Sequence, residues 1–118
     1  GGVLLATNGV ITTQTEATPS VNPRTCVGVS ADQKKVYLMA VDGRQYHYSN
    51  GMTYEELSKC MLAFGATDAL NLDGGGSTTF ITRKSVALTP DRFLLRNWPS
   101  DNGGEEREVS SSLLIVAK

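Results

Sequence analysis

Short apolar runs separated by polar or glycine-containing turns make up most of this 118-residue chain. The first two runs flank Thr7-Asn8-Gly9, a tight-turn signal, and predict a hairpin near the start. The third and fourth are rich in β-branched and aromatic residues and predict a second strand pair. Residues 89–108 form a polar segment that is predicted to be irregular. In all, strands are predicted over residues 3–6, 10–15, 25–30, 36–41, 70–73, 79–82 and 112–117.

One helix is predicted, beginning after Thr53. Thr53 and Glu56 have the spacing of a capping box, in which the hydroxyl and the carboxylate satisfy free N–H groups at the helix start. Gly65 stands where a C-terminal cap belongs. Between them, apolar residues recur at helical spacing and predict a stripe buried in the core. Its members are Leu57, Cys60, Met61 and Phe64.

Many short strands with one dominant helix indicate an α+β fold with a mixed, largely antiparallel sheet and the helix packed on one face. The other face of the sheet, or its edge, would then carry the functional side chains. The length fits a single domain over residues 1–118. Because the chain begins at Gly1 rather than at Met, we expect a processed or excised piece.

The composition narrows the range of partners. With 40% hydrophobic residues, 19% charged residues and a net charge of −1, the chain has no signature of disorder and no basic surface for nucleic acids or membranes. Apolar stretches such as 113–117 are too short to span a bilayer. Cys26 and Cys60 form either a disulfide or two buried thiols, and their places in a strand and on the apolar helix face favour thiols.

The strongest chemical signal is the segment 69–79, in which an apolar strand leads an aspartate into a glycine-rich turn. Asn71 and Asp73 lie two residues apart, so a strand would project both from one face. The same alternation would turn Leu70 and Leu72 into the core. The segment therefore predicts a carboxylate and an amide presented together at the end of a strand.

The three glycines that follow would let backbone N–H groups approach a ligand closely. Ser77 and Thr78 add hydroxyl groups at the exit of the turn. A lone Asp-Gly pair is usually an ordinary turn in which the aspartate bonds its own backbone. Three glycines between polar side chains instead favour a functional site. They are Gly74, Gly75 and Gly76.

Other polar residues are candidates to lie beside this glycine turn in a functional site. Arg24 follows a proline at a strand start, so its rigid guanidinium suits phosphate, although a surface arginine fits the local sequence equally well. Asp42 and Arg44 belong either to a site or to an ordinary strand-end turn. Trp98 is either a sugar-stacking platform or a plug over the core. The same irregular segment carries the loop candidates Asn97, Ser100 and Asp101.

Other catalytic chemistries fit the sequence less well. The glycine turn lacks the Gly-Lys-Ser/Thr end and the following helix of a phosphate-binding P-loop. The single histidine, His47, lies in an aromatic cluster, Tyr46-His47-Tyr48, which favours packing over catalysis. One histidine and two separated cysteines argue against a zinc site.

Six segments, taken in order, resemble the phosphodiester glycosidase family. They are Asn-Pro-Arg-Thr (22–25), Val-Asp-Gly-Arg (41–44), Ser-Asn-Gly-Met-Thr (49–53), the whole of 69–79, Asn-Trp-Pro-Ser-Asp (97–101) and Glu-Arg-Glu-Val-Ser (106–110). The resemblance runs from about Asn22 to Val116, and its most specific part is Asn-Leu-Asp-Gly-Gly-Gly-Ser. It implies a site built from Arg24, Asp42, Arg44, Ser49, Gly51, Asn71, Asp73, Gly74, Gly75, Gly76, Ser77, Asn97, Ser100, Asp101 and Arg107.

The resemblance implies hydrolysis at the anomeric carbon of a sugar 1-phosphodiester, such as an N-acetylhexosamine-1-phosphate ester. Such a site needs an arginine for the departing phosphate and a carboxylate that stabilises the oxocarbenium ion or activates water. We expect Asp73 as base or nucleophile, Asp42 or Asp101 as the second carboxylate, and Arg24 or Arg107 on the phosphate. No cofactor is required, and the alternative in which Asp73 ligates a hard cation such as calcium stays open.

The chain also departs from the family pattern. It lacks the Asn-Gly-Gly-Phe-like segment that members carry upstream, so we expect the C-terminal part of the family's domain, either completed by another chain or fragment or with an eroded pocket. Trp98 stands where the family has arginine, and Ser111 where it has asparagine. The missing segment favours a competing hypothesis, a non-catalytic carbohydrate-binding or assembly module, for example in a viral tail or a cell-surface protein.

The composition and the resemblance also predict the binding partners and the location of the protein. We expect a carbohydrate or sugar-phosphate partner and neither a nucleic acid nor a membrane. An extracellular or virion-associated location is favoured over a cytoplasmic one. A homo-oligomer is compatible with the sequence.

Overall fold

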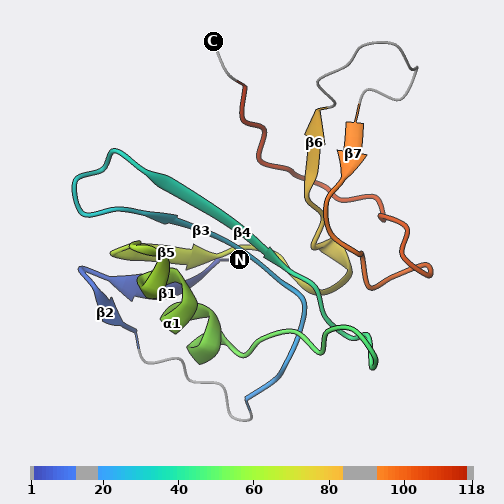
Figure 1. The fold of residues 1–118 in the computed structure, drawn as a ribbon, viewed down its shortest axis with the longest axis horizontal. Helices are drawn as coiled ribbons and strands as arrows, with labels where there is room; N and C mark the ends of the chain where they lie inside the picture. Colours follow the sequence, from blue (N-terminus) through green and yellow to red (C-terminus); the bar gives the residue numbers. More distant parts are fainter. Residues whose placement is uncertain (1, 13–18, 84–92, 117–118) are drawn as a thin grey trace.

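The computed structural model describes residues 2–12, 19–83 and 93–116, where a five-stranded sheet carries one helix on one face and a two-stranded hairpin stands beside it (Figure 1). The strand order is β2-β1-β5-β3-β4, and every neighbouring pair is antiparallel. The predicted α+β class is confirmed. The elements are β1 (Val3–Thr7), β2 (Val10–Ile11), β3 (Arg24–Val29), β4 (Val36–Val41), α1 (Tyr54–Phe64), β5 (Asp68–Asn71), the 3₁₀ turn η1 (Gly75–Ser77), β6 (Ile81–Arg83) and β7 (Phe93–Leu95).

Local signals in the sequence account for the two hairpins of the main sheet. Asn8 and Gly9 turn the chain between β1 and β2 with φ of 50° and 76°, the left-handed conformation that a two-residue hairpin requires. The backbone N–H of Asn8 also donates to Asp68 Oδ1 at 3.1 Å, which ties this turn to the start of β5. Strands β3 and β4 pair along their whole length, as predicted.

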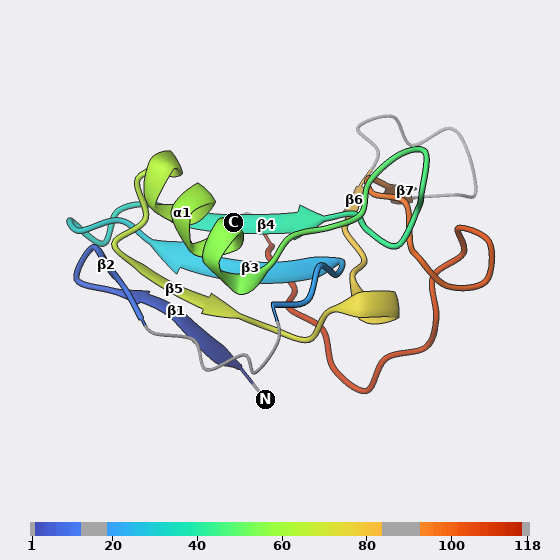
Figure 2. The ribbon, with the colours of Figure 1, turned by 90° about the horizontal axis from the view of Figure 1, so that it is seen from below.

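The helix begins and ends where its capping residues predict. Thr53 Oγ1 accepts from the N–H of Glu56 at 3.2 Å, and Glu56 Oε2 accepts from the N–H of Thr53 at 2.8 Å. Gly65 closes the helix with φ of 103°. Figure 2 shows α1 lying across one face of the sheet. No helix in the described part of the chain is long and apolar enough to cross a membrane.

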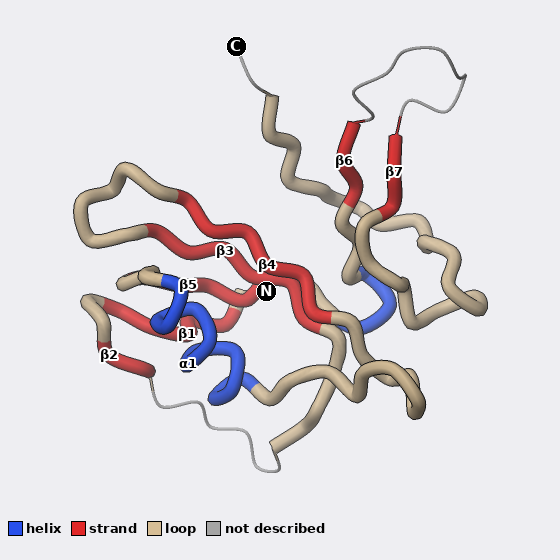
Figure 3. Tube along the Cα trace, viewed as in Figure 1, coloured by secondary structure: helices blue, strands red, loops and turns tan. Residues whose placement is uncertain are grey.

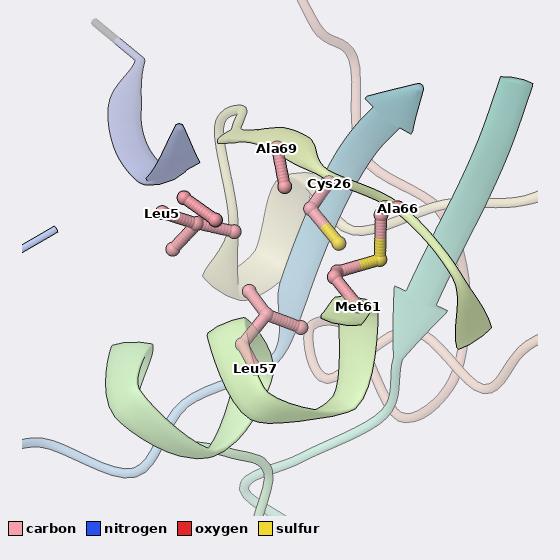
Figure 4. Close-up of a cluster of buried hydrophobic side chains, with 7 residues drawn as sticks. Leu5, Cys26, Leu57, Met61, Ala66 and Ala69 are labelled. Carbon is pink, nitrogen blue, oxygen red and sulfur yellow. The ribbon is translucent and has the colours of Figure 1, made fainter. Parts of the chain in front are cut away.

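The core lies between this helix and the sheet. Leu57 and Met61 of α1 are fully buried and pack against Leu5, Cys26 and Ala69 of the strands (Figure 4). Burial, with a contribution from the nearby thiol of Cys60, raises the pKa of Cys26 to about 12. Both cysteines are free thiols, as the sequence favours.

The predicted apolar stripe is only partly correct. Leu57 and Met61 are buried and Cys60 is half-buried, but Phe64 is 62% exposed. Ser58 is also fully buried, and its hydroxyl donates to the carbonyl of Tyr54. Phe64 lies seven residues after Leu57 and so projects in nearly the same direction, but it is the last residue of the helix and has no following turn to cover it.

The strand before the glycine turn is shifted from its predicted position. It runs over Asp68–Asn71, so Asp73 lies beyond it. The expectation that Asn71 and Asp73 share one face of a strand is therefore wrong, since Asn71 is 3% exposed on the helix side and Asp73 is exposed. The N–H of Leu72 still donates to the carbonyl of Thr25 at 2.8 Å, in register with the pairing of β5 and β3, and the chain then enters the turn.

The expectation that Leu70 and Leu72 point into the core is also wrong, since neither belongs to the buried core. Ala69 belongs to the core, and Leu70 pairs between Leu4 and Val27 on the face away from the helix. Small residues are needed on the helix side because the helix approaches closely. A Cβ on Gly28, the partner of Ala69, would lie 2.6 Å from Met61 Cε.

Strand boundaries far from local turn signals were predicted less well. Strand β6 begins at Ile81 rather than at residue 79, and β7 falls inside the segment predicted to be irregular. The described part of the predicted strand 112–117 forms no strand. Its residues Leu113 and Leu114 are 62% and 79% exposed, because an apolar run becomes a strand only where another strand can pair with it. Residues 13–15 and 117 of the predicted strands lie outside the described residues.

Truncating the helix side of the core should destabilise the fold strongly. Leu57→Ala is expected to lower the free energy of unfolding by about 2–5 kcal/mol, because the lost side chain is fully buried and leaves a cavity. The same substitution at the exposed Leu114 is the matched control and should change it by less than about 0.5 kcal/mol. Urea unfolding of both variants measures this, and similar losses in the two would contradict the described core.

Candidate active site

The antiparallel topology brings the predicted functional segments to one end of the sheet. Strand β3 starts at this end, where Arg24 pairs with Val41 at the end of β4. Strand β5 also ends here, since Asn71 pairs with Cys26. The loops that leave β4 and β5 therefore emerge at the same end of the sheet, on either side of β3 (Figure 3). These loops carry Asp42 and Asp73.

The glycine turn packs tightly against the start of β3. Gly75 donates its N–H to the carbonyl of Pro23 at 3.0 Å. A Cβ on Gly74 would lie 2.7 Å from that same oxygen, so any larger residue would collide with backbone. The N–H of Gly74 donates back to Asp73 Oδ1 at 3.0 Å. Glycine is thus required here for close packing.

Asp101 lies directly over this turn. A Cβ on Gly76 would lie 1.9 Å from Asp101 Oδ2, so the carboxylate occupies the space that the glycine leaves. Arg107 Nη1 forms an ion pair with the same Oδ2 at 3.2 Å, and its Nη2 donates to Ser77 Oγ at 2.6 Å. Ser100 Oγ lies 3.4 Å from Asp101 Oδ1. Two segments distant in sequence thereby meet.

Asp73 is the most accessible carboxylate of this group. Its side chain is exposed, and its pKa is held below the ordinary value chiefly by a hydrogen bond from the Ser77 hydroxyl. The N–H of Gly74 and the charge of Arg107 lower the pKa further, against the opposing effect of desolvation. The carboxylate is therefore anionic at neutral pH. We call Asp73, Ser77, Asp101 and Arg107 the Asp73–Arg107 cluster.

A second guanidinium borders the turn at Gly75. A Cβ on Gly75 would lie 3.2 Å from Nη1 of Arg44, and φ of Gly75 is 62°. Nε and Nη2 of Arg44 donate to Asn22 Oδ1 at 3.2 and 3.0 Å. In the sequence, Asn22 was identified only as part of the Asn-Pro-Arg-Thr segment, and no sequence feature indicated that it binds Arg44. The turn thus lies between Arg44 and Asp101.

Asp42 joins two loops through hydrogen bonds. Its carboxylate accepts from Nδ2 of Asn97 at 3.0 Å and from the N–H of Trp98 at 2.9 Å. Its backbone carbonyl accepts from Ser49 Oγ at 2.6 Å. Asn97 also donates to the carbonyl of Thr78 at 2.9 Å, which extends this hydrogen-bond network to the exit of the glycine turn. These bonds place the segment that carries Asp101.

Three predicted site residues are buried behind the turn. The guanidinium of Arg24, which is 5% exposed, donates to the carbonyls of Met52 and Ser20 at 2.8 and 2.7 Å and lies 3.8 Å from the ring centre of Tyr54. Asn71 donates to the carbonyl of Leu72, and its buried Oδ1 has no hydrogen-bond partner among the described atoms. Thr78 is 1% exposed and accepts from the hydroxyl of Thr25. A fourth predicted site residue, Gly51, is half-buried and packs against the backbone of Asn22.

The acidic groups do not form a metal cage of the usual amino-acid ligands. In the described residues, no three side chains of His, Cys, Asp or Glu lie close enough together to hold a metal ion. A calcium ion at Asp73 would thus have to draw on carbonyl, hydroxyl or water oxygens for its remaining ligands. That alternative stays a prediction.

Comparison with known proteins agrees with the sequence motifs. Residues 1–116 match a family model described as phosphodiester glycosidase. The match covers nearly the whole chain and includes every segment that carries the resemblance. A comparison with curated proteins found no match.

Removing the Ser77 hydroxyl should raise the pKa of Asp73 toward the ordinary aspartate value of about 3.9, because that hydroxyl stabilises the charged carboxylate. Titration of the carboxyl carbon by NMR in Ser77→Ala measures this. The matched control is Ser30→Ala, since Ser30 Oγ donates to Asp32 Oδ1 at 2.6 Å and lowers the pKa of that carboxyl instead. Each substitution should move only its own aspartate, and an unmoved Asp73 in Ser77→Ala would refute the assigned hydrogen bond.

Proposed function

The chain belongs to the phosphodiester glycosidase family, and we propose that it hydrolyses a sugar 1-phosphodiester at the anomeric carbon, with an N-acetylhexosamine as the sugar. The products would be the free sugar and a phosphomonoester. The observation that carries this proposal is the Asp73–Arg107 cluster, in which two carboxylates and a guanidinium meet over a glycine turn. Family membership supports glycosidase chemistry in general, and the cluster supports these particular roles.

The two guanidinium groups at the turn are suited to different tasks. Arg107 is paired with the carboxylate of Asp101, so much of its charge is already balanced. Arg44 instead donates to the neutral amide oxygen of Asn22, which fixes its orientation without neutralising it. We therefore assign the phosphate to Arg44, with Arg107 holding Ser77 and Asp101 in place. Arg24, our other sequence candidate for the phosphate, is engaged with backbone carbonyls and Tyr54.

The low pKa of Asp73 favours a role in its charged form. A carboxylate that stays ionised stabilises positive charge on the sugar ring or attacks the anomeric carbon, but it is a weak proton donor. In the net reaction the bond from C1 to the phosphate oxygen breaks and the electron pair leaves with phosphate. Water supplies the new oxygen on C1, and its proton ends on the phosphomonoester. We assign Asp101 as the second carboxylate of the site, because the carboxylate of Asp42 is engaged in hydrogen bonds with Asn97 and Trp98.

Removing the charge of Asp73 should abolish turnover. Asp73→Asn is expected to lower kcat about 10²–10⁴-fold, because the amide can neither stabilise the cationic ring nor act as nucleophile or base. Release of N-acetylglucosamine from its methyl 1-phosphodiester measures this. The matched control is Asp32→Asn, which alters an exposed aspartate at the far end of β3 and β4 and should leave turnover unchanged.

Two outcomes would count against the proposal. Equal turnover by wild type and Asp73→Asn would remove Asp73 from the chemistry. Sugar binding without turnover in wild type would support the competing hypothesis, a non-catalytic carbohydrate-binding or assembly module.

The position of bond cleavage is a separate test. In water enriched in heavy oxygen, attack at the anomeric carbon should place the label in the sugar and none in the phosphomonoester. Mass spectrometry of the phosphomonoester decides this, because its oxygens do not exchange with water under these conditions. Label in the phosphate would instead show cleavage of the phosphorus–oxygen bond and would overturn the assignment of a glycosidase reaction.

A further inference from the structure

A hollow is lined partly by residues of the loop that carries Asp101. Its volume is about 420 Å³, which is within the range of about 300–1,000 Å³ that small-molecule sites occupy. We call it the Trp98 pocket. It is lined by Tyr48, Leu95, Arg96, Asn97, Trp98, Gly103 and Gly104.

Trp98 is fixed through its backbone while its ring remains open to solvent. Its N–H donates to both carboxylate oxygens of Asp42, at 2.9 and 3.0 Å, and its carbonyl accepts from Nε2 of Gln45 at 2.8 Å. The residue is nevertheless 56% exposed. It is therefore no plug over the core, and the other interpretation left open by the sequence, a sugar-stacking platform, agrees with its exposure.

A second aromatic ring completes an apolar corner. Tyr48, from the loop after β4, is 65% exposed, and its ring centre lies 5.9 Å from that of Trp98 at an interplanar angle of 45°. Gly104 lies against the indole, where a Cβ would be 2.4 Å from Trp98 Nε1. The glycine thus keeps the chain close to one edge of the indole. Two tilted, accessible rings form a surface against which a flat apolar face can stack.

Polar groups border the same corner. Arg96 is held by a hydrogen bond from its Nε to Thr82 Oγ1 at 2.6 Å. Asn97 is fully engaged within the protein, since its Nδ2 donates to Asp42 and to the carbonyl of Thr78 and its Oδ1 accepts from the N–H of Phe80 at 2.7 Å. Aromatic faces beside an oriented guanidinium suit a sugar ring, whose C–H face stacks on the rings while a hydroxyl accepts from Arg96.

One loop carries both this pocket and part of the cluster. Asp101 lies three residues after Trp98, and its carbonyl accepts from the N–H of Gly104 at 3.0 Å. We propose that the Trp98 pocket binds a neutral pyranose ring of the same glycan, adjacent to the sugar held at the cluster. The inference rests on the proposed function for the identity of the ligand as a glycan. The preferred substrate would then contain at least two sugar rings.

Trp98 is the only tryptophan of the chain, so its fluorescence reports directly on this pocket. The probes are N-acetylglucosamine and its β-linked dimer and trimer, titrated into the full chain carrying Asp73→Asn, which prevents turnover. We expect a saturable change in fluorescence, with the dimer and trimer binding at least about tenfold more tightly than the monomer. Absence of any change, or equal affinity for all three sugars, would overturn the inference.

Calorimetry on variants separates stacking from a general effect on folding. Tyr48→Ala should weaken trimer binding about five- to tenfold. The matched control is Tyr46→Ala, which removes an 88% exposed ring that packs on His47 and does not line the pocket, and which should bind like the parent. Equal losses in both variants would contradict a specific stacking site.

The two proposals fail in different ways. If wild type releases no sugar but Trp98 fluorescence still changes with the trimer, the pocket stands and the enzymatic function fails. If wild type cleaves the methyl phosphodiester but the titration is flat, the function stands and this inference fails.

Discussion

The packing of the glycine turn against the start of β3 is the constraint on which the rest of the site depends. Gly75 bonds to the carbonyl of Pro23, and Gly74 approaches the same oxygen so closely that a side chain there would collide with backbone. On the other side, Gly76 makes room for the carboxylate of Asp101. The turn is thus enclosed by two other segments, which fixes the directions of Asp73 and Ser77. The structure thus shows that its glycines serve close packing.

The two aspartates that follow strands β4 and β5 show how surroundings decide the role of a carboxylate. Asp42 accepts hydrogen bonds from Asn97 and Trp98, so its charge is used to hold a loop. Asp73 is exposed and is bonded by Ser77, so its charge remains available to a ligand. The sequence presented both as Asp-Gly pairs at strand ends. Only the contacts made by distant segments separate the structural carboxylate from the accessible one.

The sequence predicted the parts of the fold that depend on neighbouring residues. The capping box at Thr53, the hairpin turn at Gly9 and the pairing of β3 with β4 follow from local chemistry, and all were confirmed. Features that depend on distant neighbours were predicted less well. Phe64 has the right spacing but is exposed at the last position of the helix, and the apolar residues 113–116 form no strand with any described segment.

The same distinction holds for the candidate site. The motif at 69–79 located the turn, and the resemblance included Asp101 and Arg107, whose contacts with it span 25 residues or more of sequence. The role of Arg24 could not be foreseen, because its ring contact with Tyr54 and its bond to the carbonyl of Met52 arise only when β3 meets the start of the helix. A guanidinium after a proline suits phosphate equally well until those partners are known.

The electrostatics of the cluster bear on which substrates it can serve. An ordinary glycoside leaves as an alkoxide and needs a carboxyl group with a raised pKa to protonate it. The accessible carboxyl of this cluster has a lowered pKa, because Ser77, Gly74 and Arg107 all favour its charged form. A phosphodiester needs less help, since the departing phosphate carries its charge stably, and in the proposed function the guanidinium of Arg44, which Asn22 fixes, would bind it. A site that stabilises a carboxylate anion and supplies a fixed cation is therefore better matched to a sugar phosphate than to a simple glycoside.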